Sequence, residues 1–278
     1  MDDATGMAAG APLSERQRRE FEYHRERARA HEHVLTDPFS WDVLQNPARR
    51  WWNAYWQMYA CLLDCGVRDK RVLVVGCGFG DDALRLAKLG ARVSAFDLSP
   101  DSLRIARELA VREGLSIAFD EMPAEAMRYA DASFDLVVAR DILHHVDIPA
   151  AMREIARVAR PGAIFVVDEI YSHSWTERIR RSPPVEKFIY PCMRRLIYGP
   201  GTPYITADER KLDEADLAEI MKPLQACLSE HYFNFLVTRL VPDRFDFCAK
   251  ADCLLLRLLK PLAPLLAGRV LFVARFAK

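Results

Sequence analysis

The feature that most constrains the fold is a glycine loop that follows directly on a run of apolar residues. Residues 72–75 read Val-Leu-Val-Val, a short continuous run that is typical of a strand buried on both faces. Gly76, Gly78 and Gly80 follow at alternating positions, and a helix-forming stretch begins at Asp81. The segment predicts a strand, then a turn whose bare backbone can lie against a ligand, then a helix.

The same alternation of apolar runs and helix-forming stretches continues to residue 168. Such a pattern favours a mostly parallel sheet covered by helices on both faces. We expect strands at 72–75, 92–97, 115–119, 134–139 and 163–168, and helices at 81–89, 99–112 and 148–159.

The segments on either side of this region are less regular. Ser14 is suited to cap a charged helix that runs to about residue 30. Residues 49–63 carry aromatic side chains at helical spacing, and this stripe either packs on the core or also meets a ligand as a lid. Beyond residue 168 we expect a helix at 213–221, a sixth strand at 232–238, helical structure at 245–266 with a break at Pro261, and a last strand at 269–276.

Composition narrows the class of protein. Lys and Arg total 39, as do Asp and Glu, so no overall field attracts or repels nucleic acid, and we expect no nucleic-acid partner. The seven cysteines have neither the spacing of a disulfide framework nor that of metal ligands. We therefore expect free thiols in the cytoplasm and no metal site. The first residues have no basic region and no apolar run, so we expect no signal peptide, and the apolar run 253–266 is too short and interrupted to span a bilayer.

The glycine spacing and Asp97, which ends the next strand, indicate a nucleoside-bearing cofactor. In a dinucleotide fingerprint the third glycine follows the second by three positions, whereas here it follows by two. The loop has no lysine for phosphates, which excludes a P-loop.

From about residue 70 to 170 the chain resembles the class I S-adenosylmethionine-dependent methyltransferases of the small-molecule type. The resemblance lies in residues 72–80, 91–100, 133–138 and 157–163. It implies a Rossmann-like, seven-stranded and mostly parallel sheet whose last strand is antiparallel. It also implies S-adenosylmethionine as the cofactor.

The resemblance implies eight cofactor-binding residues. Asp97 would accept hydrogen bonds from both ribose hydroxyls, since a carboxylate can take two at once. Leu98 would pack on the adenine face. The others are Gly76, Gly78 and Gly80 along the methionine and ribose, Ala124 and Glu125 at the adenine edge, and Arg140 through its backbone at the methionine end.

Two positions depart from the family pattern. Val74 stands where an acidic residue is often found, and Pro123 replaces an aspartate before the adenine-edge alanine. The cofactor ammonium and the adenine amine must then find other partners, such as backbone carbonyls or Glu125. Two further possibilities remain open: the chain binds the cofactor poorly, or it uses the fold for another purpose.

The catalytic candidates follow the fourth and fifth strands at the ligand edge of the sheet. One of His144 and His145, with His144 favoured, would act as a general base for a hydroxyl or amine. Alternatively, they are structural histidines of a sequence common in the family. Asp168 and Glu169 would orient a substrate, or would serve in capping or pairing with an arginine.

The expected function is methyl transfer to oxygen or nitrogen of a small, largely apolar or lipid-like acceptor. The alternatives are non-methylating chemistry on the same fold and a non-catalytic cofactor-binding or scaffold protein. We expect a helical cap at 1–66 and a methyltransferase domain at 67–278, with insertions at about 171–212 and 240–266. The C-terminal apolar run suits core packing, a pocket roof or peripheral membrane contact.

Overall fold

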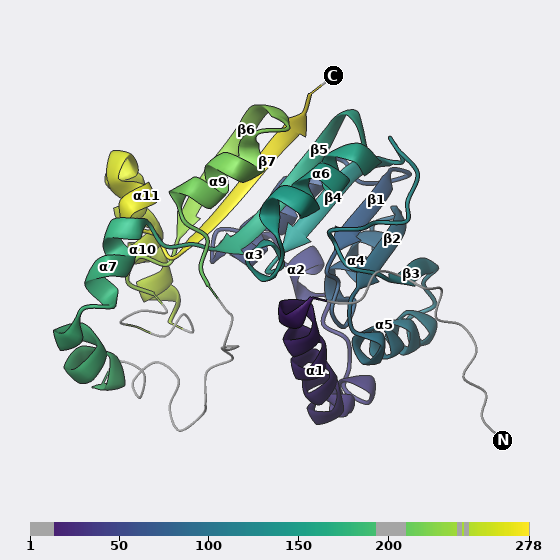
Figure 1. The fold of residues 1–278 in the computed structure, drawn as a ribbon, viewed down its shortest axis with the longest axis horizontal. Coiled ribbons are helices and arrows are strands. Elements are labelled where there is room, and N and C mark those ends of the chain that lie inside the picture. Colours follow the sequence, from purple (N-terminus) through teal and green to yellow (C-terminus); the bar gives the residue numbers. More distant parts are fainter. Residues whose placement is uncertain (1–13, 193–209, 238–240, 242–244, 278) are drawn as a thin grey trace.

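In the described part of the chain, seven strands form one sheet in the order β3-β2-β1-β4-β5-β7-β6. The computed structural model, drawn in Figure 1, describes residues 14–192, 210–237, 241 and 245–277. Strands β1 to β5 pair in parallel, and β7 runs antiparallel to both β5 and β6. The predicted fold class is therefore confirmed. The strands are β1 (Arg71–Val75), β2 (Arg92–Asp97), β3 (Ile117–Glu121), β4 (Phe134–Arg140), β5 (Ala159–Ile170), β6 (Leu224–Phe233) and β7 (Arg269–Phe276).

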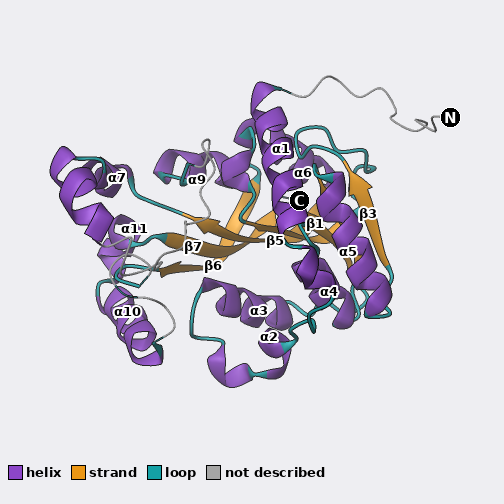
Figure 2. Ribbon diagram, turned by 90° about the horizontal axis from the view of Figure 1, so that it is seen from below, coloured by secondary structure: helices purple, strands orange, loops and turns teal. Residues whose placement is uncertain are grey.

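Helices cover both faces of the sheet, as Figure 2 shows. Along β1, Val72 and Val74 pack toward α3 and α4, while Leu73 and Val75 pack toward α6. This alternation explains why the strand is apolar throughout. One face carries α3 (Ala54–Asp64), α4 (Asp81–Lys88) and α5 (Pro100–Arg112), and the other carries α6 (Ile148–Val158) and α9 (Glu214–Met221).

Helix α1 (Glu15–Ala30) begins where the sequence predicts. The Ser14 side chain accepts a hydrogen bond from the backbone of Gln17, and the Gln17 side chain accepts one from the backbone of Ser14. The helix packs against α5, whereas α3 packs on the sheet. The N-terminal helices thus lie on different parts of the fold, and the boundary at residue 66 stays a prediction.

Two predicted strands are displaced. The third was expected at 115–119 but begins at Ile117, because the Leu115 amide still bonds to Ala110 at the end of α5 and Gly114 turns there with φ +66°. The fifth is longer than the expected 163–168. It pairs with β4 from residue 159 and with β7 up to residue 170. Pro161 and Gly162 lie within this strand and obscure its apolar pattern in the sequence.

Two further expectations are wrong in position. The helix expected at 49–63 begins at Ala54, because the Asn53 side chain caps it by accepting from the amide of Trp56. The sixth strand, expected at 232–238, ends at Phe233, where Asn234 takes φ +65°. This is an edge strand whose exposed positions include Ala226 and Leu228 as well as Gln225 and Glu230, so apolar and polar residues do not alternate along it.

The remaining elements surround this frame. The predicted break in the C-terminal helical run is confirmed, although residues 240 and 242–244 of the expected insertion lie outside the described residues, as do 193–209 of the other. These elements are α2 (Asp42–Gln45), α7 (Ser174–Arg180), a π-helical turn (Val185–Ile189), α10 (Asp246–Leu258), a 3₁₀ turn (Lys260–Leu262) and α11 (Ala263–Leu266).

Replacing Gly80 by alanine tests how tightly the loop packs. Gly80 and Gly114 both have positive φ, but a Cβ on Gly80 would lie 2.9 Å from that of Ala106, whereas one on Gly114 would meet nothing within 4 Å. We expect Gly114→Ala to cost about 1–2 kcal/mol of unfolding free energy for the left-handed backbone alone. Gly80→Ala should cost about 1–3 kcal/mol more through overpacking. Equal losses in urea denaturation would contradict this packing.

Candidate active site

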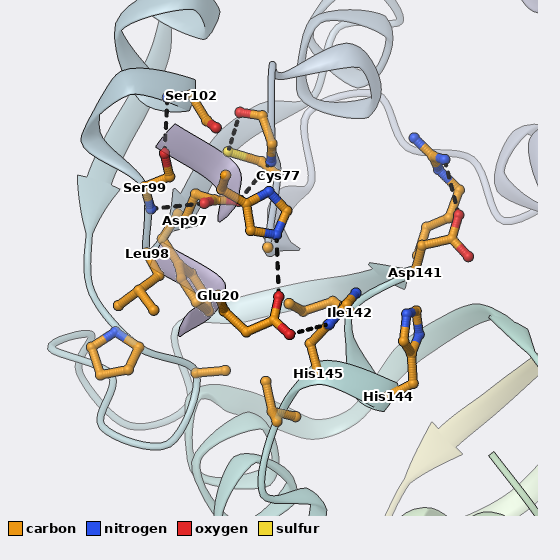
Figure 3. A pocket seen from close by; sticks show the side chains of 18 of the residues that line it. Glu20, Cys77, Asp97, Leu98, Ser99, Ser102, Asp141, Ile142, His144 and His145 are labelled. Atoms are coloured by element: carbon orange, nitrogen blue, oxygen red, sulfur yellow. Dashed lines mark hydrogen bonds and ion pairs between the residues drawn. The ribbon is translucent and has the colours of Figure 1, made fainter. Parts of the chain in front are cut away.

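A cavity of about 420 Å³ lies at the carboxyl ends of the parallel strands, beneath α1. This is the edge at which open α/β sheets bind ligands. Figure 3 shows side chains from the glycine loop, the end of β2, the segment after β4 and helix α1 converging on it. Of the predicted site residues, those that line the cavity are Gly76, Gly78, Asp97, Leu98, Ala124, Glu125, Arg140 and His144.

The three loop glycines differ in their surroundings. A Cβ on Gly76 would lie 2.5 Å from the Ile142 side chain, while one on Gly78 would meet nothing within 4 Å. Gly78 therefore presents open backbone to the cavity. Gly80 does not line the cavity and instead packs against α5, so the structure separates it from the other two.

Asp97 is held at the end of β2 by backbone donors. Its Oδ2 accepts from the Gly78 amide at 2.8 Å, and its Oδ1 accepts from the Ser99 amide at 2.9 Å. The residue is 8% exposed, and each carboxylate oxygen has a further lone pair. A buried carboxylate is thus fixed at the cavity wall with capacity to accept additional hydrogen bonds, beside the apolar side chain of Leu98.

One face of α1 forms a wall of the cavity that the sequence did not predict. The Gln17 side chain donates to Glu125 at 3.1 Å, and the Arg16 guanidinium donates to the carbonyl of His144 at 2.6 Å. Glu125 also accepts from the backbone amide of Asp147, so it ties α1 to the segment after β4. The α1 residues in the wall are Gln17, Glu20, Phe21, His24 and Arg27.

A stripe at helical spacing was the available signal for this wall. Residues 17, 20, 21, 24 and 27 recur on one side of the helix. Because the stripe is mostly polar, it resembles a solvated face rather than one that covers a site.

A buried carboxylate between two histidines fastens α1 at this wall. Glu20 lies 3.2 Å from Nδ1 of His145 and 3.6 Å from Nε2 of His24. Figure 3 shows Glu20 beside His145. Burial raises the pKa of Glu20, but the pairing with His145 and His24 outweighs it and lowers the pKa well below its usual value. The carboxylate is therefore ionised when α1 is in this position.

His144 is oriented by Glu169 from the neighbouring strand. Glu169 Oε2 lies 2.7 Å from Nδ1 of His144, and both side chains are buried. Glu169 Oε1 accepts from the amides of Ile142 at 2.7 Å and Leu143 at 2.6 Å. An ionised carboxylate in this position favours a proton on Nδ1, which assigns the basic lone pair of the ring to Nε2.

Arg140 is the last residue of β4, and its side chain enters a buried ion network. Its Nε donates to Asp82 Oδ2 at 2.7 Å, and Tyr59 donates to Asp82 Oδ1 at 2.5 Å. Burial lowers the pKa of Arg140, but Asp82 and Asp141 raise it well above its usual value, so the guanidinium stays charged. The sequence resemblance had implied only a backbone role for this residue.

Arg269 of β7 extends the network to the other side of the cavity. It donates to Asp141 Oδ1 at 2.6 Å and to Asp168 Oδ1 at 2.6 Å. Burial raises the pKa of Asp141, but Arg269 and Arg140 lower it overall, so this cavity-lining carboxylate is ionised. Of the alternatives for Asp168, pairing with an arginine is the arrangement observed.

Within the described residues, no three metal-ligating side chains gather in one place. None of the helices in that part of the chain combines the length and apolar character needed to cross a bilayer.

Comparisons with known proteins agree with this geometry. Residues 73–167 match the family model described as a methyltransferase domain. A ubiquinone biosynthesis O-methyltransferase of Methylocella silvestris is 41% identical over 95 residues, which is 34% of this chain and 37% of that protein. The methyltransferase GfsG of Streptomyces halstedii is 38% identical over 138 residues, 48% of each chain. The alignments span 37–58% of the length of the curated relatives.

A solved structure extends the likeness of fold to nearly the whole chain. Magnesium protoporphyrin IX methyltransferase from Synechocystis PCC 6803 superposes with a TM-score of 0.57 at 12% identity, covering 95% of this chain and 100% of that one. The family match identifies a methyltransferase domain at residues 73–167, and the sheet order and the cavity at its carboxyl edge are consistent with such a domain.

The pKa of Asp168 provides a test of the buried network. Burial raises this pKa to about 6, against the opposing effect of Arg269. Since the unfolded value is near 3.9, the folded state binds the extra proton between about pH 4 and 6. The stability of the wild type relative to Asp168→Asn should therefore fall by roughly 1–3 kcal/mol as pH rises through that window. A pH-independent difference in urea unfolding would contradict the assignment.

Proposed function

We propose that this protein transfers a methyl group from S-adenosylmethionine to an oxygen or nitrogen of a small, largely apolar acceptor. The observation that carries the proposal is the single cavity lined both by the Gly78–Asp97 cradle and by His144. Cofactor chemistry and proton transfer would thus meet in one enclosed space.

The cofactor half of the cavity has donors and acceptors of the right kind. Asp97 keeps acceptor capacity for two ribose hydroxyls, and Leu98 and Met122 offer apolar surface to a base. Gly78 leaves room along the backbone. Asp141, ionised and at the cavity wall, takes the role of ammonium partner that Val74 does not supply.

The five other residues implied by the resemblance have distinct parts in the proposal. Gly76 lets the loop turn beside Ile142, and Gly80 packs the loop on α5. Ala124 and Glu125 border the base, and Arg140 anchors the segment at the methionine end.

We infer that the acceptor binds at the end of the cavity that holds His144. The cavity lining includes the apolar residues Phe21, Ile142, Val146 and Ile170. An acceptor with apolar surface would bury it against these side chains, since ligand pockets are mainly apolar with a few polar groups that fix orientation. The relatives named ubiquinone biosynthesis O-methyltransferases support oxygen as the acceptor atom.

Catalysis then depends mainly on alignment. When bound, the sulfonium supplies an electrophilic methyl group. The chain's own residues hold the acceptor in line and exclude water beneath α1. His144 takes the proton from the acceptor on Nε2, and Glu169 stabilises the imidazolium through Nδ1. The free thiols support a reducing cytoplasmic location.

Asp97→Ala tests the cofactor site. We expect cofactor binding to weaken by about 1.5–3 kcal/mol, because hydrogen bonds to a charged group are lost. Isothermal calorimetry with S-adenosylmethionine measures the change. Asp101→Ala, which removes the same side chain from the first turn of α5 outside the cavity lining, is the matched control. An unchanged dissociation constant for Asp97→Ala would place the ribose elsewhere.

His144→Ala tests the base. We expect kcat to fall about 100-fold or more while cofactor affinity is kept, because the proton acceptor is lost. S-adenosylhomocysteine release and product mass are the measurements, and they also separate methyl transfer from other chemistry. His231→Ala, on edge strand β6 away from the cavity, is the control.

Glu169→Gln extends this test to the positioning residue. It should shift the pH profile of kcat, because the amide no longer stabilises a charged imidazolium. Full turnover of His144→Ala at all pH values would remove His144 from the mechanism.

A further inference from the structure

Exposed apolar side chains gather on the two segments that follow the fifth and sixth strands. Eleven large hydrophobic residues are exposed in the described part of the chain, and nine of them lie in residues 175–189 and 245–262. Contiguous exposed apolar surface marks sites of interaction with proteins or membranes. The nine are Trp175, Ile179, Phe188, Ile189, Phe245, Phe247, Leu254, Leu258 and Leu262, here called the apolar surface.

The elements that carry this surface lie together at one end of the molecule. Helix α7 packs against α11, and α11 packs against α10. The Thr176 hydroxyl donates to the carbonyl of Leu265, which fastens α7 to α11. Both ribbon views show α7, α10 and α11 beside each other at this end, in Figures 1 and 2.

Helix α10 presents apolar side chains on two opposite sides. Ala249 and Leu256 are buried against the fold. Phe247, Leu254 and Leu258, at spacings of seven and four, point outward, and Phe247 is 81% exposed. A helix that needed only to pack on the protein would carry polar residues on the second side.

Basic residues lie among these apolar side chains. Segments 174–192 and 245–262 hold seven lysines and arginines against four aspartates and glutamates, an excess of three positive charges in a chain of net charge zero. On the protein, Glu177 is already paired with Arg180 and Arg181. The exposed cations of the surface are Arg178, Arg181, Lys187, Lys250, Arg257 and Lys260.

We propose that the apolar surface docks on the face of an anionic lipid bilayer. Aromatic and aliphatic side chains bordered by lysine and arginine fit the boundary between lipid headgroups and acyl chains. A second copy of the chain fits less well, because two such surfaces would bring like charges together.

Helix α7 follows the carboxyl end of β5, where Ile170 lines the cavity. The docking surface is therefore at the same edge of the sheet as the cavity. The proposal does not depend on methyl transfer, since it concerns binding to lipid without cofactor or acceptor.

Co-sedimentation of the full chain with vesicles tests the proposal. We expect binding to phosphatidylcholine vesicles with about 30% phosphatidylglycerol, little binding to phosphatidylcholine alone, and release by high salt. Phe247→Ser with Leu258→Ser should weaken binding about tenfold or more, as should Arg178→Glu with Lys187→Glu. Val111→Ser is the matched control, because Val111 is 80% exposed on α5, away from the surface.

Three results would overturn the proposal. The wild type fails to bind anionic vesicles, or Val111→Ser loses binding as much as the surface variants do. The third result is that the Phe247→Ser/Leu258→Ser variant binds vesicles less and is also changed as a protein. Either it melts at a markedly lower temperature, or its mass in light scattering changes. A lower melting temperature would mean that another part of the chain covers these side chains, and a changed mass would mean that a second copy does. Cofactor calorimetry on the same variants separates this proposal from that of methyl transfer.

Discussion

The buried charges beneath the cavity are the constraint on which the rest of the site depends. Arg140 and Arg269 lie between Asp82, Asp141 and Asp168, which join α4, β4, β5 and β7. An unpaired buried charge costs several kcal/mol, so the buried carboxylates Asp82 and Asp168 depend on their arginine partners staying in place. The network also holds Asp141 at φ +53°, a conformation that a residue with a side chain seldom adopts.

The segment after β4 couples the two halves of the cavity. On the side of β5, Glu169 holds this segment through the amides of Ile142 and Leu143 and the ring of His144. On the side of α1, Arg16 donates to the carbonyl of His144, and Glu20 pairs with His145. Closing α1 over the cofactor half and positioning the candidate base therefore depend on the same few residues.

The α1 wall of the cavity and the apolar surface lie outside the region that the family model matches. The family model matches residues 73–167, whereas α1 precedes that range and α7, α10 and α11 follow it. The matched region supplies the Gly78–Asp97 end of the cavity, whereas the wall made by α1 and the exposed apolar surface lie outside it.

The sequence determined the sheet and its glycine loop, because a run such as residues 72–75, followed by glycines, leaves few other structures open. It also predicted Asp97 and His144 at the edge that proved to hold the cavity. Tertiary structure alone decided the wall made by α1, the pairing of His144 with Glu169, and the place of β6. These depend on contacts between residues far apart in the chain, such as Arg16 with His144, and local patterns carry no information about such partners.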